Sequence, residues 1–213
     1  MTSLLRADIG LKSATKEEEA KSIANDSASH AEEDILRLID VNASSLAEFK
    51  RIVKKLLPKG GKPVKSLEVY IGILTAQQLA HLFELVNDRA HRTMENIIFW
   101  KVTFPKSASS VLEEFAERLG EGLQGLKTLM VYCCLFSEES SRKALLTFST
   151  RFLRLGSELN RLWLEDFFRQ GAETQDLLDS ISQNERIQIE HLDLGQNRCL
   201  ILNVEALQRL LLR

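Results

Sequence analysis

Apolar residues recur along this chain in two alternating patterns, one with the spacing of a β-strand and one with the spacing of an α-helix. A short segment with apolar residues at relative positions 1, 4 and 6 appears six times, beginning at Leu36, Val64, Met94, Leu126, Leu159 and Ile189. Successive residues at position 4 lie 28, 30, 32, 33 and 30 residues apart and are Ile39, Leu67, Ile97, Leu129, Leu162 and Leu192. A recurrence with this period indicates a repeat architecture.

Between the repeated segments the apolar spacing changes to that of a helix. The stretch after the second segment, for example, has Leu79, Leu82, Phe83 and Val86 with polar residues between them. Period-2 segments that alternate with helical segments predict strand–helix units. One such unit cannot bury its own apolar face, so neighbouring units are expected to stack into a single core.

The alternation of a strand sends positions 4 and 6 to one face and positions 5 and 7 to the other. The position 6 residues are Val41, Val69, Phe99, Val131, Leu164 and Leu194. Position 5 reads Asp40, Glu68, Ile98, Met130, Trp163 and Asp193. Position 7 reads Asn42, Tyr70, Trp100, Tyr132, Glu165 and Gly195. All the tryptophan and tyrosine of the chain therefore falls in two columns on the face that is expected to be exposed.

These two columns are apolar or aromatic in the middle and polar at the ends. A protein interface commonly has this arrangement of an anchor core inside a polar rim. The expected partner-binding residues are Tyr70, Ile98, Trp100, Met130, Tyr132, Trp163, Glu68 and Glu165. The alternative is that some of the aromatic rings pack against one another along the sheet and stabilise it.

The repeat resembles the leucine-rich repeat, whose pattern is LxxLxLxx(N/C)xL. The clearest copies run from Leu126 to Phe136 and from Ile189 to Cys199, with Cys134 and Asn197 at position 9. The long period is similar to that of the ribonuclease-inhibitor-like subfamily. The resemblance implies an α/β leucine-rich-repeat solenoid, a curved horseshoe arc of about six strand–helix units. Its parallel sheet would be concave and its helices convex, over residues 34–213.

A different fold for the same pattern is a set of unrelated strand–helix units of the Rossmann type. In-register repetition of positions 1, 4 and 6 is not expected in that fold. No GxGxxG sequence follows any of the predicted strands either. The sequence therefore favours the repeat.

Composition fits an ordinary soluble domain. The chain has 28 basic and 30 acidic residues, a net charge of −2, so its overall charge gives no reason to expect nucleic acid as a partner or insertion into a membrane. No apolar run approaches the length of a bilayer span. The three cysteines form no disulfide framework, so we expect a cytoplasmic location, in a host cell if the chain is a delivered effector.

The sequence offers few candidate catalytic residues. We expect that the protein is not an enzyme and that it binds neither a cofactor nor a metal. No CxxC or HExxH sequence is present, and the four histidines are far apart. Cys133 has no recognisable histidine base beside it, so a reactive thiol is disfavoured. The basic run from Lys54 to Lys65 lacks the phosphate-binding GxxxxGK[ST] spacing and is expected to be a solvated loop. Acids of the strands, such as Asp166, are expected to form a polar rim.

The two ends of the chain differ from the repeat. Residues 1–33 are rich in charged and small polar residues and are expected to be a polar tail or cap. Residues 34–213 form the expected repeat domain. The chain stops on an apolar helix with Leu207, Leu210 and Leu211, so self-association through this end is expected, or else a further segment in the natural gene.

The expected function is that of a non-enzymatic module that binds a protein partner through its concave strand face. The chain is also similar in style to bacterial leucine-rich-repeat effectors that act on host proteins. The alternative function is a regulator of an enzyme, similar to the GTPase-activating proteins built on this repeat. A fragment of a larger receptor-like protein is a third possibility.

Overall fold

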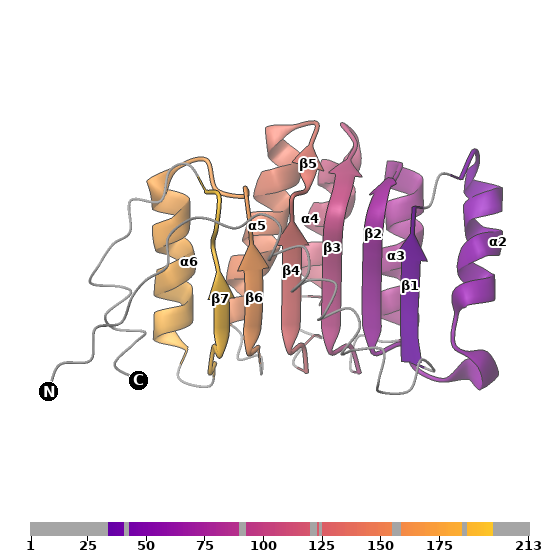
Figure 1. Cartoon of the computed structure of the whole chain (residues 1–213), viewed down its shortest axis with the longest axis horizontal. Helices are drawn as coiled ribbons and strands as arrows, with labels where there is room; N and C mark the ends of the chain where they lie inside the picture. Colours follow the sequence, from indigo (N-terminus) through magenta and orange to yellow (C-terminus); the bar gives the residue numbers. More distant parts are fainter. Residues whose placement is uncertain are drawn as a thin grey trace, which may run out of the picture. The chain divides into compact units, whose positions relative to one another are not determined.

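Strands and helices alternate along the chain (Figure 1). The computed structural model describes residues 34–40, 43–89, 93–119, 123, 125–154, 159–184 and 187–197. The strands of the described part are β1 (Ile35–Ile39), β2 (Ser66–Ile73), β3 (Asn96–Phe104), β4 (Thr128–Tyr132), β5 (Leu135–Phe136), β6 (Arg161–Leu164) and β7 (His191–Asp193). Its helices are α2 (Leu46–Leu56), the short 3-10 turn η3 (Lys59–Gly61), α3 (Ala76–Arg89), α4 (Ala108–Leu119), α5 (Glu139–Arg154) and α6 (Gly171–Gln183).

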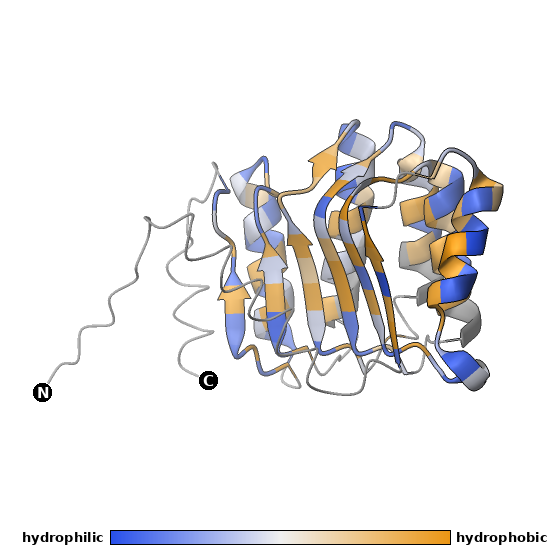
Figure 2. Ribbon diagram, turned by 45° about the vertical axis from the view of Figure 1, so that its right-hand side comes forward, coloured by the Kyte–Doolittle hydropathy of each residue, from blue (hydrophilic) through white to orange (hydrophobic). Residues whose placement is uncertain are grey.

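All the strand pairs in the described part are parallel, and the strands are arranged in chain order. The order is β1-β2-β3-β4-β6-β7, and the short β5 pairs with the end of β3. The fold is therefore α/β with a seven-stranded parallel sheet. Each helix contacts the helix before or after it in the chain, so α2 to α6 form one layer, which lies on one side of the sheet (Figures 1 and 2).

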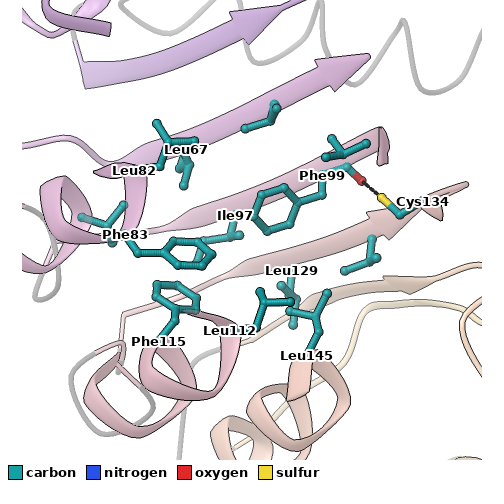
Figure 3. Close-up of a cluster of buried hydrophobic side chains, with 14 of the residues drawn as sticks. Leu67, Leu82, Phe83, Ile97, Phe99, Leu112, Phe115, Leu129, Cys134 and Leu145 are labelled. Carbon is teal, nitrogen blue, oxygen red and sulfur yellow. Dashed lines mark hydrogen bonds between the residues drawn. The ribbon is translucent and has the colours of Figure 1, made fainter. Parts of the chain in front are cut away.

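The core lies between the sheet and this helical layer. It contains the position 4 and 6 residues of β2, β3, β4 and β6 together with apolar residues of every helix. Figure 3 shows Leu67, Ile97 and Leu129 from three neighbouring strands facing Leu82 of α3 and Leu112 of α4. Phe83 and Phe115 stack between α3 and α4 with ring centroids 3.7 Å apart. The prediction that these strand positions face the core is confirmed.

The register of the first unit differs from the prediction by three residues. Leu36 pairs with Leu67 and Leu38 with Val69, and both leucines are buried. Ile39, predicted to face the core at position 4, is 62% exposed and lies opposite Tyr70. The reason is that Leu36 and Leu38 offer the same alternation as Ile39 and Val41, and the pattern alone does not decide between the two.

This shift changes the outward columns at β1. Arg37 takes position 5 and Ile39 takes position 7, so the prediction that Asp40 takes position 5 is wrong; Asp40 instead follows the strand and is exposed. Val41, Asn42, the polar segment 1–33 and the apolar helix at the chain end, with its expected self-association, lie outside the described residues.

A repeated backbone conformation occurs at position 8 of each unit. The residue after position 7 has a positive φ in all six units, at Asp40, Ile71, Lys101, Cys133, Asp166 and Gln196. Their φ angles lie between 47° and 55°. Residues other than glycine rarely adopt this conformation. Its recurrence at intervals of 31, 30, 32, 33 and 30 residues shows that the units share a backbone turn as well as a sequence pattern.

The polar groups of this turn are satisfied by position 9 in the two clearest copies. The side-chain oxygen of Asn197 accepts hydrogen bonds from the backbone N–H groups of Phe167 and Phe168, both at 2.7 Å. Its amide nitrogen donates to the carbonyls of Leu164 and Leu194. The Cys134 thiol donates to the Phe99 carbonyl at 3.4 Å (Figure 3). Asn and Cys at position 9 therefore link one unit to the unit before it.

Candidate protein-binding face

The predicted outward residues lie in register across neighbouring strands. At position 5 the pairing runs through Glu68, Ile98, Met130, Trp163 and Asp193. At position 7 it joins Tyr70 to Trp100 and Trp100 to Tyr132, and Glu165 follows directly after β6. In the described part of the chain, the helices all pack on the other face of the sheet. The structure therefore brings the eight predicted site residues together on one face, which we call the aromatic strand face.

The expected exposure of this face is wrong for most of its residues. The two tryptophans retain only 9% (Trp100) and 6% (Trp163) of their accessible surface. Ile98, Met130, Glu68 and Glu165 are also buried, whereas Tyr70 and Tyr132 are half-buried. The accessible part of the aromatic strand face is therefore narrower than the sequence suggested.

Contact between rings on adjacent strands is one physical reason for this burial. Neighbouring strands lie about 4.8 Å apart, which brings large side chains in the same column into contact. Trp100 and Tyr132 are stacked with ring centroids 3.9 Å apart and an interplanar angle of 14°. Trp163 lies 4.5 Å from the ring of His191 on β7. The alternative in which aromatic rings pack along the sheet is thus confirmed for these residues.

A charged network lies beside Tyr70 at the β1 end of the face. The Glu68 carboxylate accepts a hydrogen bond from Arg37 Nε at 2.7 Å and another from Ser66 Oγ at 3.0 Å. The first of these bonds joins β1 to β2. Burial, reinforced by the negative charge of Glu68, raises the pKa of the Tyr70 hydroxyl. Tyr70 therefore remains neutral at physiological pH, and its hydroxyl is hydrogen-bonded to the Glu68 carboxylate.

A second carboxylate lies beside Tyr132 at the β6 end of the face. The Cys133 thiol is 3.8 Å from Glu165 Oε1, a weak sulfur hydrogen bond. Burial, followed by the charge of Glu165, raises the pKa of Cys133, and the same two causes raise the pKa of Tyr132. A raised pKa disfavours the thiolate, which is the nucleophilic form of cysteine. This arrangement supports hydrogen bonding rather than nucleophilic attack by Cys133.

Exposed apolar residues gather at the carboxyl ends of β1, β2 and β5. They lie at position 7, 8 or 10 of their units, and they are Ile39, Ile71, Ile73 and Leu135. Ile73 and Leu135 both pair with Thr103 of β3, one on each side of it. We call these four residues the carboxyl-end patch. It adjoins Tyr70 in the chain through Ile71 and in the sheet through Ile39.

The sequence analysis missed the carboxyl-end patch. Positions 8 and 10 lie outside the apolar positions of the repeat, so isoleucine or leucine there is unexplained by the core. That excess was the available signal. The outward columns at positions 5 and 7 do not include positions 8 and 10, and Ile39 was predicted to face the core.

The described part of the chain also limits other kinds of site. Its histidine, cysteine, aspartate and glutamate side chains form no cluster of three that could hold a metal ion. Within the same residues no helix is both long and apolar enough to cross a bilayer.

Comparison with known proteins adds no relative. The chain matches no protein-family model, and no curated protein matches its sequence.

Proposed function

We propose that the chain is a solenoid of the leucine-rich-repeat type and a non-enzymatic module that binds another protein. Three observations support the solenoid: six units have parallel strands in chain order, each has a left-handed residue at position 8, and two have a position 9 side chain that bonds to the preceding unit. Stacked units of this kind bury a continuous core and leave the strand face for recognition.

The observation that carries the proposal is the meeting of aromatic and exposed aliphatic residues at the carboxyl ends of neighbouring strands. Tyr70 and Tyr132 are half-accessible there, and the carboxyl-end patch is exposed beside them. Tyrosine and aliphatic side chains supply apolar contact, and a tyrosine hydroxyl oxygen can accept a hydrogen bond from a partner. We propose that the buried Trp100 supports this surface by stacking on Tyr132 and holding its ring in position.

The test is affinity capture with the tagged full-length chain. The variant Ile71→Lys/Leu135→Lys places two charges on the carboxyl-end patch without entering the core. Leu56→Lys is the matched control, because Leu56 is also an exposed aliphatic residue but lies on α2. We expect captured proteins that are lost with the double variant and retained with the control. Capture that is unchanged by the double variant contradicts the proposed surface.

A further inference from the structure

One segment of the chain has a large excess of basic over acidic residues. The segment 46–65, which contains α2, η3 and the approach to β2, has one acidic residue, Glu48. Its basic residues number seven: Lys50, Arg51, Lys54, Lys55, Lys59, Lys62 and Lys65. This gives the segment a net charge of +6, although the whole chain has −2, so the rest of the chain has −8. The small net charge of the whole chain therefore results from a positive segment and a negative remainder that nearly cancel.

The fold turns these basic side chains outward. α2 buries Phe49 and Val53 in the core, and its helical period places Lys50, Lys54 and Lys55 away from them, where they are exposed. The α2 helix is the first of the helical layer and lies beside β1 (Figure 1), and the hydrophilic colour of its outward residues and of η3 is visible in Figure 2. We call the basic residues of segment 46–65 the α2 basic surface.

Four of these seven basic residues form no ion pair within the described part of the chain. Lys65 pairs with Asp34 at 3.0 Å, and Arg51 approaches Glu48 at 3.9 Å. Among the described residues no carboxylate forms an ion pair with Lys50, Lys54, Lys55 or Lys59. Lys54 and Lys55 lie in the last turn of α2, where the helix dipole stabilises positive charge. The helix dipole does not account for Lys50 or Lys59.

We propose that the α2 basic surface docks the protein on an anionic lipid bilayer. The composition of the surface favours this occupant over a protein or a nucleic acid. Lysine is depleted at protein interfaces, and nucleic-acid sites commonly use arginine forks and stacked aromatic rings. Six of the seven basic residues here are lysines, whose compact charges suit a diffuse layer of anionic headgroups.

An exposed aliphatic residue lies inside this basic surface. Leu56, at the end of α2, is 43% exposed and follows Lys55 directly. The turn after it is held by Pro58 and by Gly60, which has a φ of 74°. A leucine with lysines near it in the chain can enter the headgroup region of a bilayer while the lysines contact the phosphates. This docking does not depend on the proposed protein partner, because the α2 basic surface and the carboxyl-end patch share no residue.

The test measures partition of the full-length chain onto sedimenting vesicles. The vesicles contain phosphatidylcholine alone or phosphatidylcholine with phosphatidylserine. We expect binding to the anionic vesicles only, with an affinity that falls as salt is raised. Each lysine near an anionic surface contributes about a fivefold factor, so Lys54→Gln/Lys55→Gln should lower the partition coefficient about tenfold or more.

Two further variants separate local from general electrostatics. Lys50→Gln/Lys59→Gln should lower partition by a similar factor without touching the last turn of α2. Lys101→Gln/Lys143→Gln removes the same charge from exposed lysines elsewhere and should leave partition nearly unchanged. Equal loss with this control, equal binding to neutral vesicles, or tighter binding to an RNA duplex or a polyglutamate peptide at the same salt would each overturn the proposal.

Discussion

Individual residues explain where the units of this protein are joined. Asn197 uses both its oxygen and its nitrogen to bond the backbone of the preceding unit. Arg142 has a similar role between helices, because its guanidinium is 1% exposed and bonds to Glu173 at 2.7 and 3.0 Å and to the Phe167 carbonyl at 3.0 Å. It also pairs with Glu139. The repeat pattern includes Asn197 at position 9 but does not include Arg142, so the contacts of Arg142 could not be predicted from it.

The Arg142–Glu173 pair should make stability depend on pH. Burial opposes ionisation of Glu173, but hydrogen bonds from Arg142 and from the Arg169 and Gln170 N–H groups outweigh it, so the pKa of Glu173 is lowered. A lowered folded-state pKa adds stability above the unfolded value, near 4.5, and that stability is lost as pH falls through the folded value.

Urea unfolding between neutral and acidic pH measures this dependence. Glu173→Gln should cost about 3 kcal/mol at neutral pH, because it leaves the buried guanidinium with less compensation. As pH drops below 4.5, the free energy of unfolding of the variant should also decrease less than that of the wild type. Asp176→Asn, on the exposed side of the same helix, is the control and should be nearly neutral. Equal effects of both substitutions would contradict the assigned role of Glu173.

The left-handed residue at position 8 gives a second prediction at the residue scale. Ile71 is β-branched and has a φ of 49°, a conformation that costs about 1–2 kcal/mol for residues with a Cβ. Ile73, two residues later, is exposed to a similar degree but has ordinary strand geometry.

Glycine at these two positions should therefore have opposite effects. Ile71→Gly should raise the free energy of unfolding or leave it unchanged, because glycine removes the strain. Ile73→Gly should lower it by about 1 kcal/mol, because glycine weakens a strand. Thermal and chemical unfolding of the two variants provide the comparison. A loss of stability at Ile71 as large as that at Ile73 would show that the left-handed turn is not present.

At the scale of elements, the period of the apolar residues predicted the strands of units two to six and the helices that follow the strands of units two to five. It did so because positions 4 and 6 are both core positions, as Leu129 and Val131 show. The prediction was wrong for β1, where two overlapping alternations exist. It was also wrong for the exposure of Trp100 and Trp163, since alternation assigns a side chain to a face but does not say what packs beside it there.

Alanine substitutions in β1 test the corrected register. Leu36→Ala should destabilise the protein by about 2–5 kcal/mol, as expected for a buried leucine. Ile39→Ala should change stability by less than about 0.5 kcal/mol, because Ile39 is largely exposed. Urea unfolding distinguishes the two, and the reverse order would restore the register in which Ile39 faces the core.

At the scale of the molecule, the described part of the chain has one layer of helices and one parallel sheet, so its two faces have different chemistry. The core lies between the two layers. The helical layer carries the α2 basic surface on its outer side. The sheet provides the aromatic strand face and the carboxyl-end patch. The aromatic columns could be predicted from the sequence, whereas the carboxyl-end patch depends on which apolar residues the core leaves outside.

The most direct test of the proposed function is hydrogen exchange of the full-length chain bound to a protein that it captures. The account predicts slower exchange in peptides that cover residues 70–73, 100–104 and 132–136, at the carboxyl ends of β2 to β5, with little change in α3 and α4. Slower exchange confined to the helices, with the carboxyl ends of the strands unaffected, would contradict binding through the strand face.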